Sequence, residues 1–234
     1  DWSSDVCSSD LQPSGLLQCL PKTEVTVCPI TVTDRNTYEE NRMEMFDIRT
    51  PEGVLTGEVK ERSAVHRDGD WHGTAHIWLV RQNGGKTEVL LQKRSSRKET
   101  FPGCYDASCA GHLSAGDSFA EGALRELEEE LGLEAKEEDL YPAGIYPCQV
   151  DDYFGGVHVL DREISALFLY EKPVREEELT LQEEEVEGVC WIAFEQLKEL
   201  AAAGAPGYCI FPWETDALEE VFRKRYPGPA ENTV

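Results

Sequence analysis

The sequence predicts an α/β or α+β domain in which helices cover a mixed β-sheet. Short apolar runs with strand character alternate with helix-like segments through most of the chain. The 234 residues are enough for one good-sized domain or two small ones. A composition that is 40% hydrophobic and 29% charged is that of an ordinary globular protein.

The expected elements begin with a hairpin in residues 43–57, where two short apolar runs flank a Pro-Glu-Gly turn. A clearer hairpin is expected in 73–94, because two runs rich in Val, Ile, Leu and Trp flank Asn83-Gly84-Gly85. Residues 104–111 then suggest a further short strand. These three segments supply the first half of the predicted sheet.

A loop and a helix follow, the helix running from about Ser118 to Leu131 and ending at Gly132. Later apolar runs suggest three more strands and two more helices; the strands are expected in 145–150, 163–171 and 187–194, and the helices in 194–204 and 213–226. The acidic run 176–187 is predicted to be a solvated loop.

The start of the chain does not fit this pattern. When residues 1–11, DWSSDVCSSDL, are back-translated into codons, the nucleotide sequence resembles the end of a common sequencing-library adapter. We therefore expect these residues to be an artefact. Residues 12–42 are interpreted as an N-terminal extension of uncertain origin. The functional domain is expected to begin at Met43 and to cover 43–234.

The charge of the chain excludes several classes of function. With 22 Lys and Arg against 46 Asp and Glu, the formal net charge is −24, which disfavours binding to nucleic acid or to an anionic membrane surface. No run approaches the ~18 apolar residues of a membrane span. The eight cysteines form no CxxC pair and no signal peptide pattern is seen, so reduced thiols and a cytoplasmic location are expected.

The helix at 118–131 carries the residues with the clearest chemical pattern. Its apolar side is expected to lie on the sheet, and this side comprises Ala120, Leu124, Leu127 and Leu131. Glu126, Glu129 and Glu130 are predicted on the opposite side, within reach of one another. Such a set is either a solvated face or a site for a hard divalent cation such as Mg²⁺, which prefers oxygen ligands.

The context of this helix favours the cation site. From Gly111 to Leu133 the sequence reads Gly, five residues, Asp117, seven residues, and then Arg-Glu-Leu-Glu-Glu-Glu-Leu-Gly-Leu. This closely resembles the Nudix box, in which Gly, Glu and an Arg-Glu-aliphatic-any-Glu-Glu-any-Gly-aliphatic segment have the same spacing. Asp117, which stands where the family has Glu, is the single departure from the specified positions.

The resemblance implies an α/β/α sandwich and a metal-dependent hydrolase. Nudix enzymes hydrolyse nucleoside diphosphates linked to another group, and related diphosphates, with Mg²⁺ or Mn²⁺. The resemblance implies that Glu126, Glu129 and Glu130 bind the metal ion and that the Gly111 carbonyl is a further ligand. Arg125 is expected to orient the glutamates, with Asp117 as a further partner. The general base is left open between these glutamates and a carboxylate elsewhere.

Three further segments, 66–80, 90–118 and 161–170, resemble the isopentenyl-diphosphate isomerase branch of the Nudix fold. That resemblance implies a second metal site, for which the matching residues are His66, His72, His112, Asp161 and Glu163. Glu163 is also a candidate for an extra ligand or general base. The isomerases need a cysteine where this chain has Ala110, and the neighbouring Cys109 should point to the other face of its strand.

One basic cluster precedes the Phe-Pro-Gly turn, and its members are Lys93, Arg94, Arg97 and Lys98. It is predicted to contact a substrate diphosphate, the alternative being an exposed loop. The leading function is a divalent-metal-dependent diphosphate hydrolase acting on a small molecule. An isomerase and a non-catalytic nucleotide-binding module are the alternatives, and a homodimer is compatible with the family.

Overall fold

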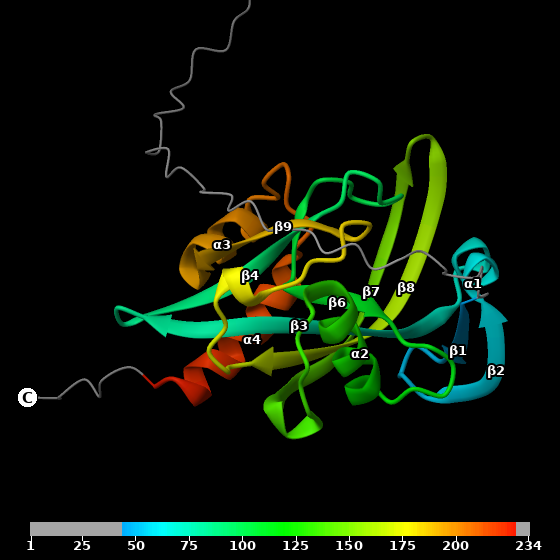
Figure 1. Ribbon diagram of the computed structural model, residues 1–234. Coiled ribbons are helices and arrows are strands. Elements are labelled where there is room, and N and C mark those ends of the chain that lie inside the picture. The colour runs from blue at the N-terminus through cyan, green and yellow to red at the C-terminus, as the bar shows by residue number, and fades with distance from the viewer. Residues whose placement is uncertain (1–43, 228–234) are drawn as a thin grey trace, which may run out of the picture.

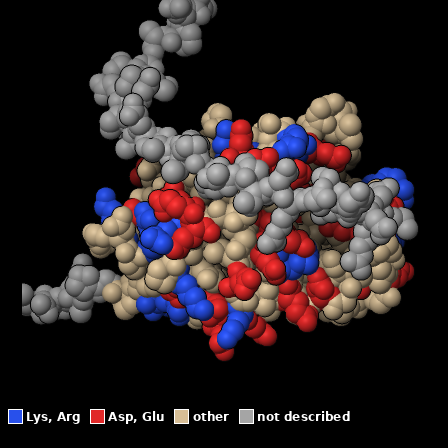
Figure 2. Space-filling model, viewed as in Figure 1, with Lys and Arg blue, Asp and Glu red and all other residues tan. Residues whose placement is uncertain are grey.

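The computed structural model describes residues 44–227 as a three-layer arrangement of helix, sheet and helix (Figure 1). The segments 1–11 and 12–42 assigned from the sequence lie outside the described residues. Within the described part, no helix is both long and apolar enough to cross a membrane. On the face drawn in Figure 2, acidic and basic side chains lie among one another.

The strands form two sheets. The small sheet pairs β1 (Met45–Arg49) with β2 (Leu55–Glu61), which confirms the first hairpin. The large sheet contains seven strands. Five of them follow the order β5-β4-β3-β8-β7; in addition, β6 pairs with β3, and β9 pairs with β4. These strands are β3 (Trp71–Asn83), β4 (Lys86–Arg94), β5 (Tyr105–Asp106), β6 (Cys109–His112), β7 (Leu140–Phe154), β8 (Val157–Tyr170) and β9 (Val186–Ala193). Because β3 and β8 are parallel and the other pairs antiparallel, the predicted mixed sheet is confirmed.

Helices cover both faces of the large sheet. On one face, α2 (Phe119–Leu131) packs Leu127 and Leu131 against the β3 core residues. On the other face, α3 (Phe194–Ala202) and α4 (Pro212–Arg225) bury Leu197 and Leu218 against β3 and β8. The short α1 (Arg62–Asp68), which the sequence pattern did not predict, joins β2 to β3. The α/β/α sandwich is therefore confirmed.

Local signals define α2 at both ends. Ser118 caps the N-terminus, since its side chain accepts a hydrogen bond from the Glu121 N–H and the Glu121 carboxylate accepts one from the Ser118 N–H. Gly132 ends the helix in the left-handed conformation, with φ 67°. The predicted helix is confirmed, and these caps fix the position of the glutamates along it.

The hairpins also follow the sequence, although their lengths differ. β3 and β4 are joined by Gly84 and Gly85, both with positive φ, as a tight turn between twisted strands requires. β7 and β8 are longer than the runs 145–150 and 163–171 predicted, because they continue to a second Gly-Gly turn at 155–156. The extended ends carry polar and exposed residues that give no strong apolar signal.

Gly132 supports a prediction about stability. A Cβ at this position would lie 2.8 Å from the Thr180 Cβ, in addition to the strain of a positive φ. We expect Gly132→Ala to lower the free energy of unfolding by roughly 2–4 kcal/mol in urea titrations. Gly204 also has positive φ, but a Cβ there would meet no atom within 4 Å. Gly204→Ala therefore measures the cost of the positive φ alone, about 1 kcal/mol in the free energy of unfolding. Equal losses in the two variants would contradict the predicted clash.

Candidate functional site

The carboxylate of Glu126 lies directly over the backbone of β6. A Cβ added to Gly111 would lie 2.2 Å from Glu126 Cδ and 2.4 Å from each carboxylate oxygen. Only glycine leaves room for this approach. Gly111 pairs with Ala75 in the sheet, so a fixed strand holds it against α2. The fold thus brings Gly111, the first residue of the motif, into contact with Glu126, which follows Arg125 in the same motif.

The prediction that all three glutamates face away from the sheet is wrong for two of them. Glu126 and Glu130 are 8% and 4% exposed and lie on the buried side of α2 with Leu127 and Leu131. The physical reason is that β6, beneath this end of the helix, carries Gly111, which leaves space for carboxylates in a face that is otherwise apolar. Glu129 does point outward, with 52% of its side chain exposed.

Burial changes the acidity of these two groups. Desolvation is the main reason that the pKa of Glu126 is raised to about 7, with the Glu129 charge adding to it and Arg125 opposing it. Desolvation and the charge of Glu126 raise the pKa of Glu130 to about 8. Glu130 Oε2 accepts long hydrogen bonds from the Ala110 N–H, at 3.3 Å, and from Gln92 Nε2, at 3.4 Å. Both carboxylates would be stabilised in the charged form by a cation.

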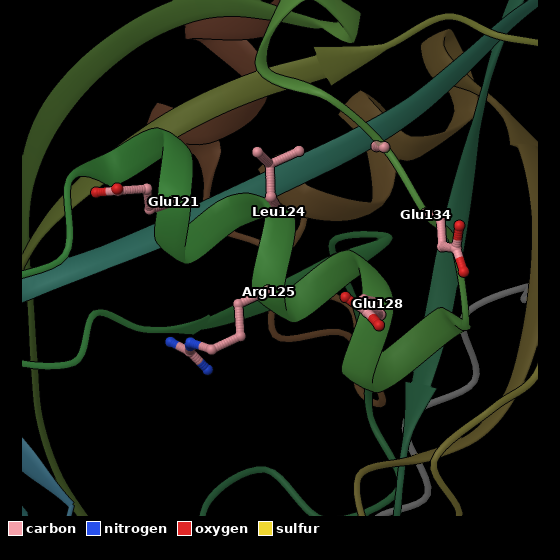
Figure 3. Close-up of a pocket in the computed structure, with 6 residues that line it drawn as sticks. Glu121, Leu124, Arg125, Glu128 and Glu134 are labelled. Carbon is pink, nitrogen blue, oxygen red and sulfur yellow. The ribbon is translucent and has the colours of Figure 1, made fainter.

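Arg125 connects the glutamates to β6. Its Nη1 donates to Glu126 Oε1 at 2.7 Å and to Glu129 Oε2 at 3.0 Å, and its Nη2 donates to the His112 carbonyl at 2.7 Å. Its Nε lies 3.7 Å from Asp117 Oδ2, so the shorter acid at position 117 still reaches the guanidinium. On the outer side of α2, Glu121, Leu124, Arg125 and Glu128 line a solvent-facing groove (Figure 3).

A second cluster lies at the other face of β6. It is formed by His66 of α1, His72 of β3, His112 of β6 and Asp161 of β8, whose ligand atoms all lie within 4.8 Å of one another. Within residues 44–227, it is the one group of three or more His, Cys, Asp or Glu that meets this distance; the helix glutamates do not. The structure thus brings together four of the five residues predicted for the second metal site.

The polar atoms of this cluster fit a metal ion. The Nε2 atoms of all three histidines and Oδ1 of Asp161 are buried and have no hydrogen-bond partner among the described residues. His72 Nδ1 lies 3.0 Å from the Asp70 carbonyl, which accepts its proton and leaves Nε2 as the electron-pair donor. Burial lowers the pKa of each of the three histidines, so the neutral, ligating form is favoured.

Glu163, the fifth predicted residue, lies beside the cluster on β8. Its Oε1 is 3.9 Å from His112 Nε2, and its Oε2 is 3.9 Å from His76 Nε2. Burial, followed by the charge of Asp161, raises the pKa of Glu163 to about 7. His76 and its partner Glu214 of α4 were not predicted from the sequence, because they are 138 residues apart and belong to no recognised motif.

The four basic residues are each engaged by an acid. Arg94 Nη1 donates to Asp106 Oδ2 at 3.0 Å, and the other three pair with the end of the acidic run. These pairs are Lys93 with Glu187 at 3.0 Å, Arg97 with Glu184 at 3.9 Å, and Lys98 with Glu185. The acidic run predicted to be a solvated loop is largely exposed at its end, although Val186 and Glu187 already belong to β9 and three of its acids pair with these cations. The charge of Lys98 opposes the raised pKa of Glu130 and adds to the lowered pKa of His112.

Comparison with known proteins identifies the family. Residues 70–213 match the NUDIX domain family, and the chain belongs to it. An uncharacterized Nudix hydrolase of Clostridium acetobutylicum is 39% identical over 154 residues, covering 66% of this chain and 72% of the relative. Nudix hydrolase 3 of Arabidopsis thaliana is 34% identical over 188 residues, covering 78% of this chain but 24% of the plant protein. The chain is thus a Nudix hydrolase.

Two further similarities concern the fold and the branch. The crystal structure of DR0079 from Deinococcus radiodurans superposes with a TM-score of 0.53 at 18% identity, covering 78% of this chain and 99% of that one. An isopentenyl-diphosphate Delta-isomerase of Halorhodospira halophila is 33% identical over 116 residues, covering 49% of this chain and 62% of the isomerase. The predicted similarity to the isomerase branch is confirmed.

The isomerase cysteine position differs as the sequence indicated. Ala110 packs toward the core under α3 and α4, whereas Cys109 is fully buried in the core under α2. The prediction that adjacent β6 residues point to opposite faces is confirmed. Cys109 therefore does not present its thiol on the face that carries His112 and Glu163.

The raised pKa of Glu130 predicts a pH dependence of stability in the metal-free protein. In the folded state Glu130 retains a proton that the unfolded chain releases near pH 4.5. Its contribution to the free energy of unfolding is therefore fully present below pH 4.5 and is lost as the pH rises through about 8. Urea unfolding in a chelator, from about pH 5 to about pH 8.5, should show a steeper loss of stability in the wild type than in Glu130→Gln. The exposed change Glu128→Gln should keep the wild-type curve; parallel curves for all three proteins would contradict the prediction.

Proposed function

We propose that this Nudix hydrolase cleaves a diphosphate bond in a small molecule and depends on divalent cations. The observation that carries the proposal is the pair of buried carboxylates on α2 in a family domain: Glu126 is packed over Gly111, and Glu130 lies against the backbone of Ala110. Charged groups are rarely buried without a partner, and Arg125 is the one cation that donates to Glu126 among the described residues. A second positive partner is needed to hold both acids in the charged form.

The residues proposed to hold cations form two sets. The first is Glu126, Glu129, Glu130 and the Gly111 carbonyl, an oxygen set suited to Mg²⁺ or Mn²⁺. The second is His66, His72, His112 and Asp161 with Glu163, where three imidazoles suit a transition metal such as Mn²⁺ better than Mg²⁺. A bound cation would supply charge neutralisation of the diphosphate and would lower the pKa of a bound water.

Side chains of the protein are proposed to supply the rest of the chemistry. Glu130 and Glu163 are the proposed candidates for general base, since each lies beside a proposed cation set and a bound cation would favour the charged form that accepts a proton. Glu129 is proposed to complete the metal site from the exposed side of α2. Arg125 is proposed to hold the glutamates in register through its contacts with Glu126 and Glu129.

The basic cluster is the proposed diphosphate contact. Lys98 is paired with Glu185, and its charge acts on Glu130 of the first proposed set. A diphosphate can replace the acidic partners of Lys93, Arg97 and Lys98, since it offers the same kind of charged oxygen. Arg94, buried with Asp106, is proposed to support the loop that carries them. A cytoplasmic location and a homodimer stay predictions.

Substitutions on α2 test the hydrolase proposal. With Mg²⁺ present, Glu129→Gln and Glu130→Gln should each lower kcat about 100-fold or more, because each removes a charged oxygen from the proposed centre. Phosphate release would be followed over nucleoside diphosphate derivatives, nucleoside triphosphates and prenyl diphosphates. Glu128→Gln, one residue away in the outer groove, should retain the wild-type rate. A Glu130→Gln protein that hydrolyses as fast as the wild type would overturn the proposal.

Isomerisation is the second candidate, because the His66 cluster and Glu163 resemble the isomerase metal site. Incubation with isopentenyl diphosphate, followed by NMR, distinguishes the two reactions. We expect no dimethylallyl diphosphate to form, since Ala110 supplies no thiol at the position that exchanges the allylic proton. Conversion without phosphate release would replace hydrolysis by isomerisation as the function of this site.

A further inference from the structure

A buried pair of charged residues lies behind Glu163, outside the Nudix motif. Glu214, in the first turn of α4, is 1% exposed, and its Oε1 accepts hydrogen bonds from His76 Nδ1 at 2.9 Å and from Trp78 Nε1 at 3.1 Å. His76 and Trp78 are two residues apart on β3 and therefore share the face of the sheet that α4 covers. The contact fixes the orientation of the His76 ring.

The other ring nitrogen of His76 faces the candidate metal site. His76 Nε2 lies 3.9 Å from Glu163 Oε2, so the imidazole stands between two carboxylates. The ring is held by Glu214 on one side, and its other nitrogen is directed at Glu163. Glu214 therefore acts on Glu163 through the ring of His76, although the two glutamates belong to α4 and β8.

Further donors hold the same oxygen of Glu163. Oε2 is approached by Cys148 Sγ and Ser165 Oγ, each at 3.4 Å, and by Thr74 Oγ1 at 3.5 Å. The single proton of the Thr74 hydroxyl is directed to the nearer Ser165 Oγ, at 2.9 Å, which links these two groups. All the polar contacts that the described residues make within 3.5 Å of this carboxylate are thus on Oε2.

The consequence is that the two oxygens of Glu163 face different surroundings. Oε2 has Cys148, Ser165 and Thr74 within 3.5 Å and His76 Nε2 at 3.9 Å, whereas Oε1 points to His112, 3.9 Å from Nε2. His112 Nε2 is one of the orphaned atoms of the His66 cluster. A carboxylate fixed in this way presents one oxygen to the cluster and has little freedom to turn away.

We propose that His76 and Glu214 are positioning residues that hold Glu163 with Oε1 directed into the His66, His72, His112 and Asp161 cluster. The inference rests on the proposed function, because it takes this cluster to bind a divalent cation. It assigns α4 a part in the site: the helix supplies the buried acid that orients the last ligand. A purely structural role, in which Glu214 only ties α4 to the sheet, predicts no effect on the cation.

Cobalt(II) binding to the metal-free protein tests the inference without any substrate. The titration would follow the ligand-field absorption of Co²⁺, and loss of the signal in His72→Ala would identify the cluster as the site observed. We expect His76→Gln and Glu214→Gln to weaken Co²⁺ binding about 10- to 100-fold and to change the ligand-field bands, as loss of outer partners of a ligand does. Glu220→Gln is the matched control, since Glu220 is an exposed acid of α4 paired with Lys224 at 2.7 Å.

The outcomes separate the inference from the proposed function. Wild-type affinity and spectrum in both folded variants would overturn the positioning role while leaving the metal site intact. A wild-type protein that binds no Co²⁺ at the cluster would overturn the second metal site, and this inference with it. Circular dichroism of the metal-free variants establishes folding. If His76→Gln or Glu214→Gln does not fold, the test rests on the other variant together with Ser165→Ala. Ser165→Ala removes another group in contact with Oε2, so it should also weaken Co²⁺ binding.

Discussion

Burial of carboxylates is the constraint on which this structure depends. Glu126, Glu130 and Glu214 are almost inaccessible to solvent in a chain whose formal net charge is −24. Removing a charged group from water is unfavourable unless a partner replaces the lost solvation. Arg125 and His76 each provide part of that replacement. The remainder is expressed as raised pKa values at Glu126, Glu130 and Glu163, which favour the protonated form of these acids.

The strand β6 contributes to both candidate sites, the carboxylates of α2 and the histidine cluster. Gly111 and His112 are adjacent, and successive residues of a strand face opposite sides of the sheet. Gly111 therefore receives the Glu126 carboxylate from α2, while the His112 ring joins the histidine cluster on the face that α4 covers. Arg125 ties α2 to this strand, because it donates to Glu126 with one nitrogen and to the His112 carbonyl with another. A single short strand thus positions both candidate centres.

The sequence predicted those features that depend on local signals. Ser118 and Gly132 define α2, and Gly84-Gly85 defines the central hairpin, because caps and tight turns are specified by residues close together in the chain. The direction of Glu126 was not predictable from helix periodicity, since it depends on the missing side chain of Gly111 in another element. The pairing of Lys98 with Glu185, 87 residues apart, and the His76–Glu214 contact depend on tertiary structure alone.

The position of α4 shows why motif matching by itself gives an incomplete site. The Nudix motif ends at Leu133, and the isomerase-like segments end at Tyr170, yet Glu214 is the acid that faces His76. A fully buried glutamate has no stabilising role as an isolated charge, because hydrophobic residues of similar size would pack there without the desolvation penalty. The buried charge of Glu214 is explained by the proposed positioning role. Glu214 orients His76, His76 faces Glu163, and Glu163 presents its other oxygen to His112. The C-terminal helix is then part of the candidate site at the histidine cluster, and not only a cover for the sheet.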